Sequence, residues 1–319
     1  MSSRRARVRS FAKINLELRV LHKRPDGFHE LRTIFQTVSL ADTIDIEFER
    51  GRTRIDLASS VDIPDNLLIR AAHLTLEAMK TTGRVRFRLK KKIPMGGGLG
   101  GGSSNAAAVL LALPALAGKR IGVERLLELA ATLGSDVPFF LLGGTAVGLG
   151  RGVELYPLPD GPAWPALLVT PGLHVSTAEA YRALDRETAT PPHASDVNQF
   201  QSLAWSWGEV AAGKALPTPI NHFETVVFRQ HPQLKSILGR LWKLGARTAL
   251  MSGSGSSLFG IFDSRESRGR AAVSIGREFG KDSAHAVSLL SRRRYRAIWW
   301  RQLAEHIDSR VWPPQSRYA

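Results

Sequence analysis

The chain has 319 residues, 43% hydrophobic and 23% charged, so it can bury a sizeable core and is not disordered as a whole. At roughly 100–200 residues per domain this length suggests two domains. The absence of cysteine excludes disulfides, thiolate catalysis and cysteine-ligated metal sites. The net charge is +16, of which residues 1–10 carry +4 and residues 285–319 carry +5, so over half lies at the two ends.

No segment of the sequence is suited to crossing a membrane. The uncharged stretch at 93–118 is broken by glycines and residues 137–150 are too few, so we expect no membrane partner. The basic N-terminus is not followed by the apolar segment of a signal peptide, and a cytoplasmic protein is therefore expected. The nine histidines include no H-E-x-x-H pair, which argues against a zincin site.

The first predicted elements are strands. Apolar and polar residues alternate at 14–20, again at 44–48, and again at 84–90, which predicts half-buried strands. In the first of these the polar face is expected to meet solvent, and it consists of Lys13, Asn15, Glu17 and Arg19. Between the second and third strands the segment 66–79 is predicted to be a helix, begun by Asp65 or Asn66.

Further helices and strands are predicted in the rest of the chain. Helices are predicted at about 103–117 and 123–133, and a Pro/Gly-rich stretch at 156–165 is the candidate domain boundary. After it we expect, in order, a strand at 164–170, a helix at 232–244, and strands at 248–252 and 257–262. Because strands and helices mix without a strict β–α–β rhythm, the pattern favours an α+β protein with two domains.

The charge and composition shifts divide the chain into three parts. An N-terminal domain is expected at 1–160, a C-terminal domain at 161–284 and a basic extension at 285–319. Basic tails are usually solvated appendages. The aromatic residues of this one leave RNA stacking or a packed helix open as alternatives, and they are Tyr295, Trp299 and Trp300.

The strongest local signal is the glycine-rich segment 94–105. Six glycines in seven residues let the backbone reach positive φ and let N–H groups approach a ligand closely. Ser103, Ser104 and Asn105 can cap the helix that follows, and a helix N-terminus behind such a loop suits phosphate. Between Glu77 and Glu124 the sequence has nine basic residues and no acidic one, so a polyanion would meet little repulsion.

Other interpretations of this loop fit less well. A flexible linker seldom runs straight into a capped helix. The spacing Gly96-x-Gly98-x-x-Gly101 matches a dinucleotide fingerprint, but the strand before it is too basic to be buried on both faces. A Walker A loop has a lysine directly after its last glycine, whereas here Gly102 is followed by Ser103. The protein-kinase signatures H-R-D and D-F-G are absent.

Residues 94–106 (PMGGGLGGGSSNA) resemble the central phosphate-binding motif of the GHMP kinases, the family of galactokinase, homoserine kinase and mevalonate kinase. Residues 10–31 (SFAKINLELRVLHKRPDGFHEL) are similar to the N-terminal strand motif of one branch, and residues 251–257 (MSGSGSS) to the C-terminal glycine motif. With further matches at 64–72, 133–152 and 221–227, the resemblance covers about residues 8–280.

The resemblance implies two α+β domains, the first like ribosomal protein S5 and the second ferredoxin-like, with ATP and the phosphate acceptor meeting between them. For the matching branch it implies transfer of the γ-phosphate of ATP, with Mg²⁺, to the 2-hydroxyl of a sugar alcohol linked to cytidine diphosphate. This small-molecule substrate belongs to the non-mevalonate route to isoprenoids.

The resemblance also implies roles for individual residues. Lys13 and Asp136 are the expected catalytic pair at the acceptor hydroxyl, although without the resemblance Asp136 would be interpreted as a helix N-cap before Pro138. The expected ATP-binding residues are Pro94, Met95, Gly96, Gly97, Gly98, Leu99, Gly100, Gly101, Gly102, Ser103, Ser104 and, in the adenine pocket, Asn66. Of these, Ser103 and Ser104 are the pair expected near Mg²⁺.

The expected substrate-binding residues lie mostly in the first motif. Asn15 matches the residue near the acceptor, and Phe28 with His29 matches the pair that holds cytosine by stacking and by hydrogen bonds. Tyr181 is either a second stacking face or a core residue. The second glycine motif is expected either to shape the cleft wall or to form a plain hairpin turn, through Gly253 and Gly255.

Two positions depart from the matching branch, where tyrosine is more usual at Phe28 and an acid at His222. Three alternatives remain beside the leading hypothesis: a GHMP kinase for a homoserine- or mevalonate-type alcohol, a basic RNA-binding protein on the same fold and, less favoured, a dinucleotide-dependent oxidoreductase. The stacking pair favours an acceptor that carries a base, and a nucleic-acid partner is not expected. No sequence pattern assigns metal ligands or an oligomeric state.

Overall fold

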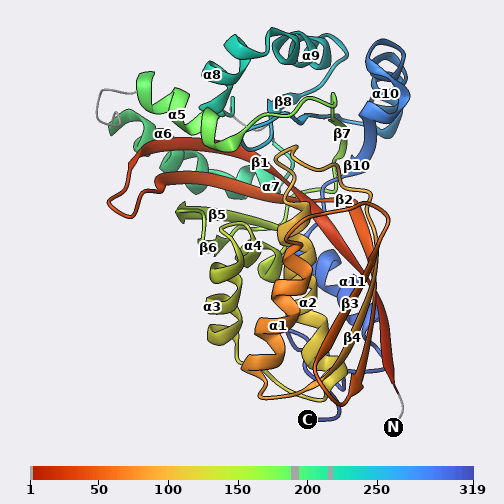
Figure 1. The fold of residues 1–319 in the computed structure, drawn as a ribbon. Helices are drawn as coiled ribbons and strands as arrows, with labels where there is room; N and C mark the ends of the chain where they lie inside the picture. Colours follow the sequence, from red (N-terminus) through yellow and green to blue (C-terminus); the bar gives the residue numbers. More distant parts are fainter. Residues whose placement is uncertain (1–2, 188–193, 215–217) are drawn as a thin grey trace.

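The computed structural model describes residues 3–187, 194–214 and 218–319, which fold around a six-stranded and a four-stranded sheet (Figure 1). The strands of the larger sheet are β1 (Arg4–Lys23), β2 (His29–Arg50), β3 (Arg54–Ser59), β4 (Gly83–Lys90), β5 (Thr145–Gly150) and β6 (Glu154–Pro157). β2 pairs with three other strands of this sheet. It pairs with nearly the whole of β1 along one edge, whereas β5 and β4 pair with its first and second halves along the other.

Helices cover one face of the larger sheet and lie side by side in Figure 1. They are α1 (Leu67–Ala78), α2 (Gly101–Ala117), α3 (Val123–Leu133) and α4 (Val137–Leu142). α2 is central and buried along almost its whole length, because it packs on the other three helices and on both long strands. Its run AAAVLLALPALA therefore has no polar face, as a helix surrounded by protein requires. The helices predicted in this half are confirmed.

The four-stranded sheet is antiparallel throughout and has the order β10–β7–β9–β8. Its strands are β7 (Pro165–Val169), β8 (Thr248–Met251), β9 (Leu258–Ile261) and β10 (Ala284–Ser288). The helices of this half are α5 (Thr177–Glu187), α6 (Ala194–Trp205), α7 (Trp207–Ala211), α8 (Phe223–Gln230), α9 (Pro232–Lys243) and α10 (Arg265–Phe279). The predicted strand at 164–170, the helix at 232–244 and the strand pair around the second glycine motif are confirmed. Across the described ranges, no helix combines the length and apolarity that a membrane span needs.

The expectation that the polar face of β1 meets solvent is wrong. Its four polar side chains are each less than 5% exposed, and they belong to Lys13, Asn15, Glu17 and Arg19. The reason is that the second half of the chain covers this end of β1: Leu18 N donates to Ile220 O at 2.8 Å, and His222 N donates to Leu18 O at 3.0 Å. Alternation predicted the strand but could not reveal a second covering layer.

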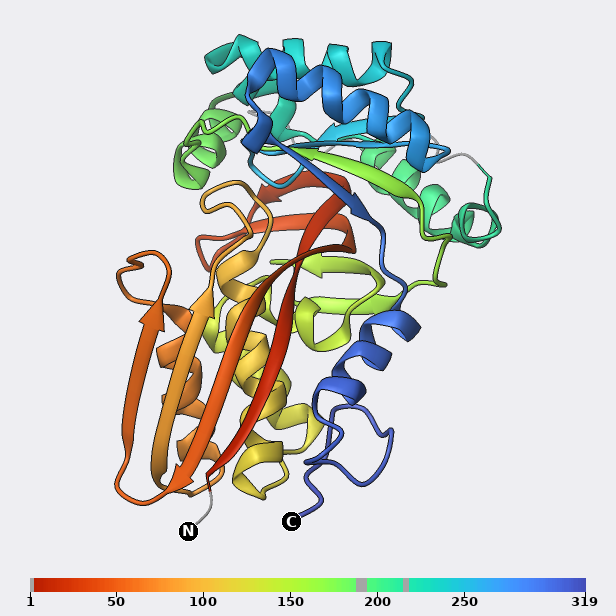
Figure 2. The same cartoon turned by 90° about the vertical axis from the view of Figure 1, so that its right-hand side faces the viewer.

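The basic C-terminal segment is a packed helix and not a solvated tail. From β10 the chain returns to the first half of the molecule and forms α11 (Arg292–Gln302), as Figure 2 shows in blue. Tyr295 and Trp299 are 1% exposed and join the core around α2 and α4. β10 runs to Ser288, so the expected domain limit at residue 284 falls inside a strand of the second sheet. The division into domains otherwise stays a prediction.

Candidate active site

The central glycine loop needs glycine for both its dihedral angles and its close contacts. Gly96, Gly98 and Gly100 have φ of +70°, +72° and +68°, in the left-handed region that other residues rarely adopt. A Cβ on Gly98 would lie 2.2 Å from the carbonyl oxygen of Ser252, whose hydroxyl donates to Gly98 O at 3.1 Å. The loop is therefore seated directly on the connection between β8 and β9.

That connection is the second glycine motif, and its expected part in the wall of the cleft stays a prediction. The motif joins two antiparallel strands, and a Cβ on Gly253 would lie 3.4 Å from Gly98 Cα, so it also packs against the loop. Asn221 fixes the motif, because its Nδ2 donates to Met251 O and to Gly253 O, each at 2.8 Å. Gly255, with φ of +90°, lies at the far end of the same turn.

The start of α2 differs from the sequence prediction. The helix begins at Gly101 with Gly100 as its N-cap, two residues before the predicted start, so Ser103 and Ser104 lie in its first turn and do not cap it. Because Gly100 has no side chain to bond the first amides of the helix, those N–H groups can serve an anion. Asn105 is buried farther along and accepts a hydrogen bond from the hydroxyl of Ser10.

The predicted ATP-binding residues divide into exposed and buried members. Three of them are exposed (Met95, Gly96 and Gly102) and four are partly exposed (Pro94, Gly98, Gly100 and Ser103), so these seven can meet a ligand directly. The buried members support the loop from beneath, and they are Gly97, Leu99, Gly101 and Ser104.

A buried ion pair that the sequence did not reveal anchors the segment leading into the loop. Asp42 is fully buried, and its Oδ1 accepts Lys92 N at 2.7 Å and Ile93 N at 2.8 Å. Its Oδ2 lies 2.9 Å from Lys91 Nζ, which also donates to Ile93 O. Burial lowers the pKa of Lys91, and the carboxylate of Asp42 opposes that shift. This pair fixes the backbone just before Pro94.

The two expected catalytic residues meet at the loop. Lys13 Nζ lies 3.4 Å from Asp136 Oδ2 and donates to Asn15 Oδ1 at 2.8 Å. The side chain of Lys13 is 5% exposed and that of Asp136 is 32% exposed, so the carboxylate opens to the surface while the ammonium lies beneath it. Lys13 N also donates to Leu99 O at 3.0 Å, which ties β1 to the glycine loop. Asp136 immediately precedes α4 but makes no side-chain capping bond to it.

A cavity of about 730 Å³ begins at Asp136 and extends between the first two strands and α5. Its lining includes Ser103 from the first turn of α2, which joins the cavity to the loop. The other lining residues are Lys23, Gly27, Phe28, His29, Leu31, Ser135, Asp136, Arg151, Thr177, Ala178, Tyr181, Arg182 and Asp185. All three residues expected to meet the cytosine are therefore in one cavity with Asp136.

His29 is held on two sides. Its ring stacks on Tyr181, with centroids 4.3 Å apart and planes 16° apart, and its Nε2 lies 2.7 Å from Asp185 Oδ1. Tyr181 in turn packs edge-on against Phe223 at 4.8 Å, and burial together with Asp136 and Asp185 raises the pKa of its hydroxyl. Asp185 was missed, although its i,i+4 spacing from Tyr181 on one helix was a usable signal.

The aromatic ring of Phe28 lines the cavity and is accessible from it. It is 49% exposed, and the guanidinium of Arg151 lies over the ring at 4.6 Å from its centroid. No pattern in the sequence marked Arg151 as its neighbour. An aromatic face beside a cation is suited to hold another planar group.

Asn66 lies at the opposite side of the loop. It caps α1 by accepting Leu68 N at 3.1 Å, whereas its Nδ2 is buried and has no hydrogen-bond partner among the residues described. Because a buried unpaired donor costs free energy, this amide is positioned to bond a ligand. α1 begins beside the start of α2, where a Cβ on Gly102 would lie 3.8 Å from the Leu67 side chain.

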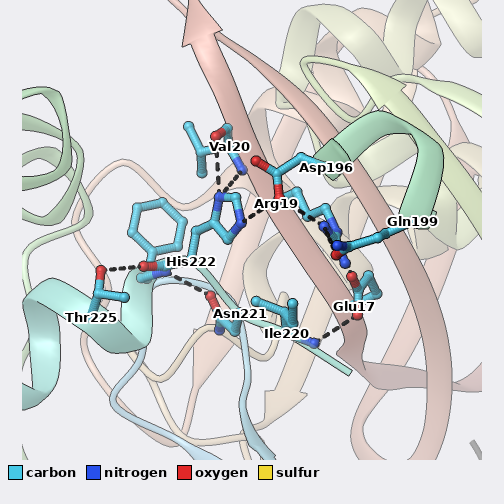
Figure 3. A network of polar contacts seen from close by, with 10 residues as sticks. Glu17, Arg19, Val20, Asp196, Gln199, Ile220, Asn221, His222 and Thr225 are labelled. Carbon is cyan, nitrogen blue, oxygen red and sulfur yellow. Dashed lines mark hydrogen bonds and ion pairs between the residues drawn. The ribbon is translucent and has the colours of Figure 1, made fainter. Parts of the chain in front are cut away.

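A polar network joins β1 to the second half of the molecule (Figure 3). Arg19 donates to Glu17 Oε1 at 2.7 Å and to Asp196 Oδ1 at 2.8 Å, and Glu17 Oε2 accepts Ile220 N at 2.7 Å. His222, which replaces the usual acid, lies 3.7 Å from Asp196, and burial lowers its pKa. In this chain that position ties α8 to β1 and α6 and does not line the cavity.

Within the described parts of the chain, no group of three or more His, Asp or Glu residues is arranged to hold a metal ion.

Comparison with known proteins agrees with this fold. The family model described as GHMP kinases N terminal domain matches residues 66–144, and that described as GHMP kinases C terminal matches residues 206–282. The class of protein is thus that of the GHMP kinases. A crystal structure of homoserine kinase from Cytophaga hutchinsonii has a TM-score of 0.69 at 19% identity and covers 90% of this chain and 95% of its own, a likeness of fold alone.

More similar proteins narrow the class. The 4-diphosphocytidyl-2-C-methyl-D-erythritol kinase of Solibacter usitatus is 53% identical over 99% of both chains, and that of Thermus thermophilus is 43% identical over 83% of this chain and 90% of its own. A crystal structure of 4-(cytidine 5'-diphospho)-2C-methyl-D-erythritol kinase has a TM-score of 0.74 at 41% identity and covers 89% of this chain and 98% of its own. The chain belongs to the 4-diphosphocytidyl-2-C-methyl-D-erythritol kinase family.

Proposed function

We propose that this protein transfers the γ-phosphate of ATP to the 2-hydroxyl of 4-diphosphocytidyl-2-C-methyl-D-erythritol, a step of the non-mevalonate isoprenoid pathway. The observation that carries the proposal is the meeting of Lys13 and Asp136, at 3.4 Å, where the glycine loop opens into the cavity that holds Phe28 and His29. Full-length similarity to kinases of that name supports it independently.

The glycine loop and the first turn of α2 would bind the triphosphate. The first amides of α2 have no side-chain cap, the helix dipole favours negative charge there, and the unpaired Asn66 Nδ2 would donate to the adenine. Mg²⁺ would accompany the phosphates and neutralise part of their charge. Nucleotide-bound Mg²⁺ takes one or two oxygen ligands from protein, and Ser103, which lines the cavity, would supply one such oxygen.

The acceptor alcohol would lie against Asp136. In the transfer the hydroxyl oxygen forms a bond to the γ-phosphorus, the bond to the β–γ bridging oxygen breaks, ADP leaves, and the hydroxyl proton passes to the Asp136 carboxylate. Lys13 lies beside that carboxylate and would stabilise negative charge on the transferred group. Asn15 orients Lys13 by accepting its hydrogen bond and is itself fixed, since its Nδ2 donates to Thr33 at 2.8 Å.

The cytosine would lie on Phe28, and its polar edge would face His29. The exposed Phe28 ring offers one stacking surface, and Tyr181 orients His29 by stacking on it. Arg151 and Lys23, which line the same cavity, supply positive charge for the diphosphate.

An acceptor panel tests the proposal. Purified protein with ATP and Mg²⁺ is given 4-diphosphocytidyl-2-C-methyl-D-erythritol, homoserine or mevalonate, and ADP release is followed by a coupled assay. We expect turnover with the cytidine-linked alcohol and less than about 1% of it with the other two, because they have no base to stack on Phe28. Turnover of homoserine or mevalonate at a comparable rate would assign a different acceptor. Submicromolar RNA binding with a steep salt dependence and no kinase activity would instead favour the RNA-binding alternative.

A further inference from the structure

Side chains of the C-terminal extension, residues 289–319, donate hydrogen bonds to carbonyls at the end of the short helix α4. The hydroxyl of Tyr295 donates to Phe140 O at 2.6 Å, and Trp312 Nε1 donates to Leu141 O at 2.8 Å. Tyr295 is 1% exposed, so its hydrogen bond is shielded from water. These contacts link two segments that are far apart in the sequence, and the mechanism proposed above does not use them.

α4 needs such partners because it is only six residues long. The last carbonyls of any helix lack partners within it, and one or two turns are unstable without tertiary contacts. In α4 the Phe139 carbonyl is satisfied by Gly143 N at 2.8 Å, and the next two carbonyls are satisfied by Tyr295 and Trp312. The extension thus supplies the donors for two of the last four carbonyls of this helix.

Two glycines in the turn after α4 leave room for residues of the extension to pack against it. Gly143 and Gly144 have φ of +68° and +73°, and a Cβ on Gly143 would lie 2.4 Å from the ring of Tyr295. The Gly143 carbonyl accepts Arg292 Nε at 3.2 Å. Asp160 holds the first turn of α11 in place, since its Oδ1 accepts Arg292 N at 2.6 Å.

The other end of α4 carries Asp136. Phe140 follows Asp136 by four residues, which is about 6 Å along a helix axis. Asp136 makes no capping bond to α4, and its contact with Lys13 is 3.4 Å long, so its position depends on where the whole helix sits. A displacement of about 1 Å at a reacting group can cost about a hundredfold in rate.

We propose that Tyr295 and Trp312 are positioning residues for the phosphoryl transfer: through Phe140 and Leu141 they fix α4 and hold the Asp136 carboxylate at the acceptor hydroxyl. This inference rests on the proposed function. It gives the extension a part in the reaction although none of its residues lines the cavity.

The variants Tyr295→Phe and Trp312→Phe test the proposal, because each keeps an aromatic ring and removes one donor to α4. The controls are Tyr318→Phe and Tyr156→Phe, whose lost hydrogen bonds go to Glu305 O within the extension and to Glu154 Oε1 on β6. We expect kcat to fall about tenfold in the first pair, with KM for both substrates changed less than twofold, and the controls to keep wild-type kcat. If Tyr295→Phe does not fold by circular dichroism, Trp312→Phe and the controls carry the same test.

A double-mutant cycle separates the positioning of the Asp136 carboxylate from a general loss of protein stability. In an Asp136→Asn background the carboxylate is already gone, so adding Tyr295→Phe should lower the residual kcat less than twofold. A further tenfold loss in that background, an equal loss in the controls, or an unchanged kcat in Tyr295→Phe and Trp312→Phe would each overturn the proposal. Wild-type protein inactive on the cytidine-linked alcohol would instead refute the proposed function.

Discussion

Lys13 is a buried ammonium whose surroundings suit an anionic ligand. It donates to Asn15 at 2.8 Å and meets Asp136 at 3.4 Å, and since an ammonium has three N–H donors, another can serve a phosphate oxygen. The alternating pattern of β1 predicted the strand and the motif predicted the role of Lys13, but neither predicted its burial. Nothing in the sequence pointed to Arg151 over Phe28, because that contact depends on how β2 and β5 pair.

At Phe28 the ring, and not a hydroxyl, is expected to bind the cytosine. Phe28→Ala should raise KM for the cytidine-linked substrate by about tenfold or more, since stacking on an aromatic ring contributes about 1–3 kcal/mol per base. KM for ATP should not change, because Phe28 is not among the residues expected to bind ATP. The check is steady-state kinetics with each substrate varied, and Phe28→Tyr is the control because it restores the usual residue. An increase in the KM for ATP alone would contradict this assignment.

At the scale of elements, buried ionisable side chains fix the segments that carry the loops. The pair of Asp42 and Lys91 holds the backbone before the central loop, and Glu224 on α8 holds β8, because its Oε1 accepts Met251 N at 2.7 Å. The sequence predicted strands within β2, β4 and β8, but it did not predict the helix α8. It could not predict the anchors, because each pairs residues from different elements and carries no local pattern.

Removing one member of the buried pair should cost more than removing both. Lys91→Met leaves the Asp42 carboxylate buried and unpaired, and we expect the free energy of unfolding to fall by about 3–5 kcal/mol. The double variant Lys91→Met/Asp42→Asn should recover part of that loss, since asparagine can still accept Lys92 N and Ile93 N without a buried charge. Urea denaturation of the three proteins measures this. A double variant less stable than Lys91→Met would contradict the account.

Glu224 should make stability fall as pH rises. Burial raises the pKa of its carboxyl to about 7, so between pH 4.5 and 7 the folded state binds a proton that the unfolded state has released. The contribution of Glu224 is therefore complete below about pH 4.5 and is lost as pH rises through about 7, a change of at most about 3 kcal/mol. Glu224→Gln, which can still accept Met251 N, should flatten this dependence. Denaturation of both proteins at pH 5 and pH 8 is the measurement, and equal pH dependence would refute it.

At the scale of the whole molecule, β1 is the element that both halves share. Its end lies under the second half, and the network of Glu17, Arg19, Asp196 and His222 fastens it there (Figure 3). The α+β class could be predicted from periodicity, and the site residues from the resemblance of short local motifs to the GHMP kinases. The covering of β1, the start of α2 at Gly101 and the packing of α11 could not, because each depends on contacts between distant parts of the chain.

The central claim is that Asp136 removes the acceptor proton while the loop presents the γ-phosphate. The most direct measurement is ADP release by wild-type protein and by Asp136→Asn with saturating 4-diphosphocytidyl-2-C-methyl-D-erythritol, alongside calorimetric titration of both proteins with ATP. We expect kcat to fall by about 10²–10⁴-fold in the variant, while the dissociation constant for ATP stays within about threefold. Asp136→Asn that turns over at the wild-type rate would contradict the account.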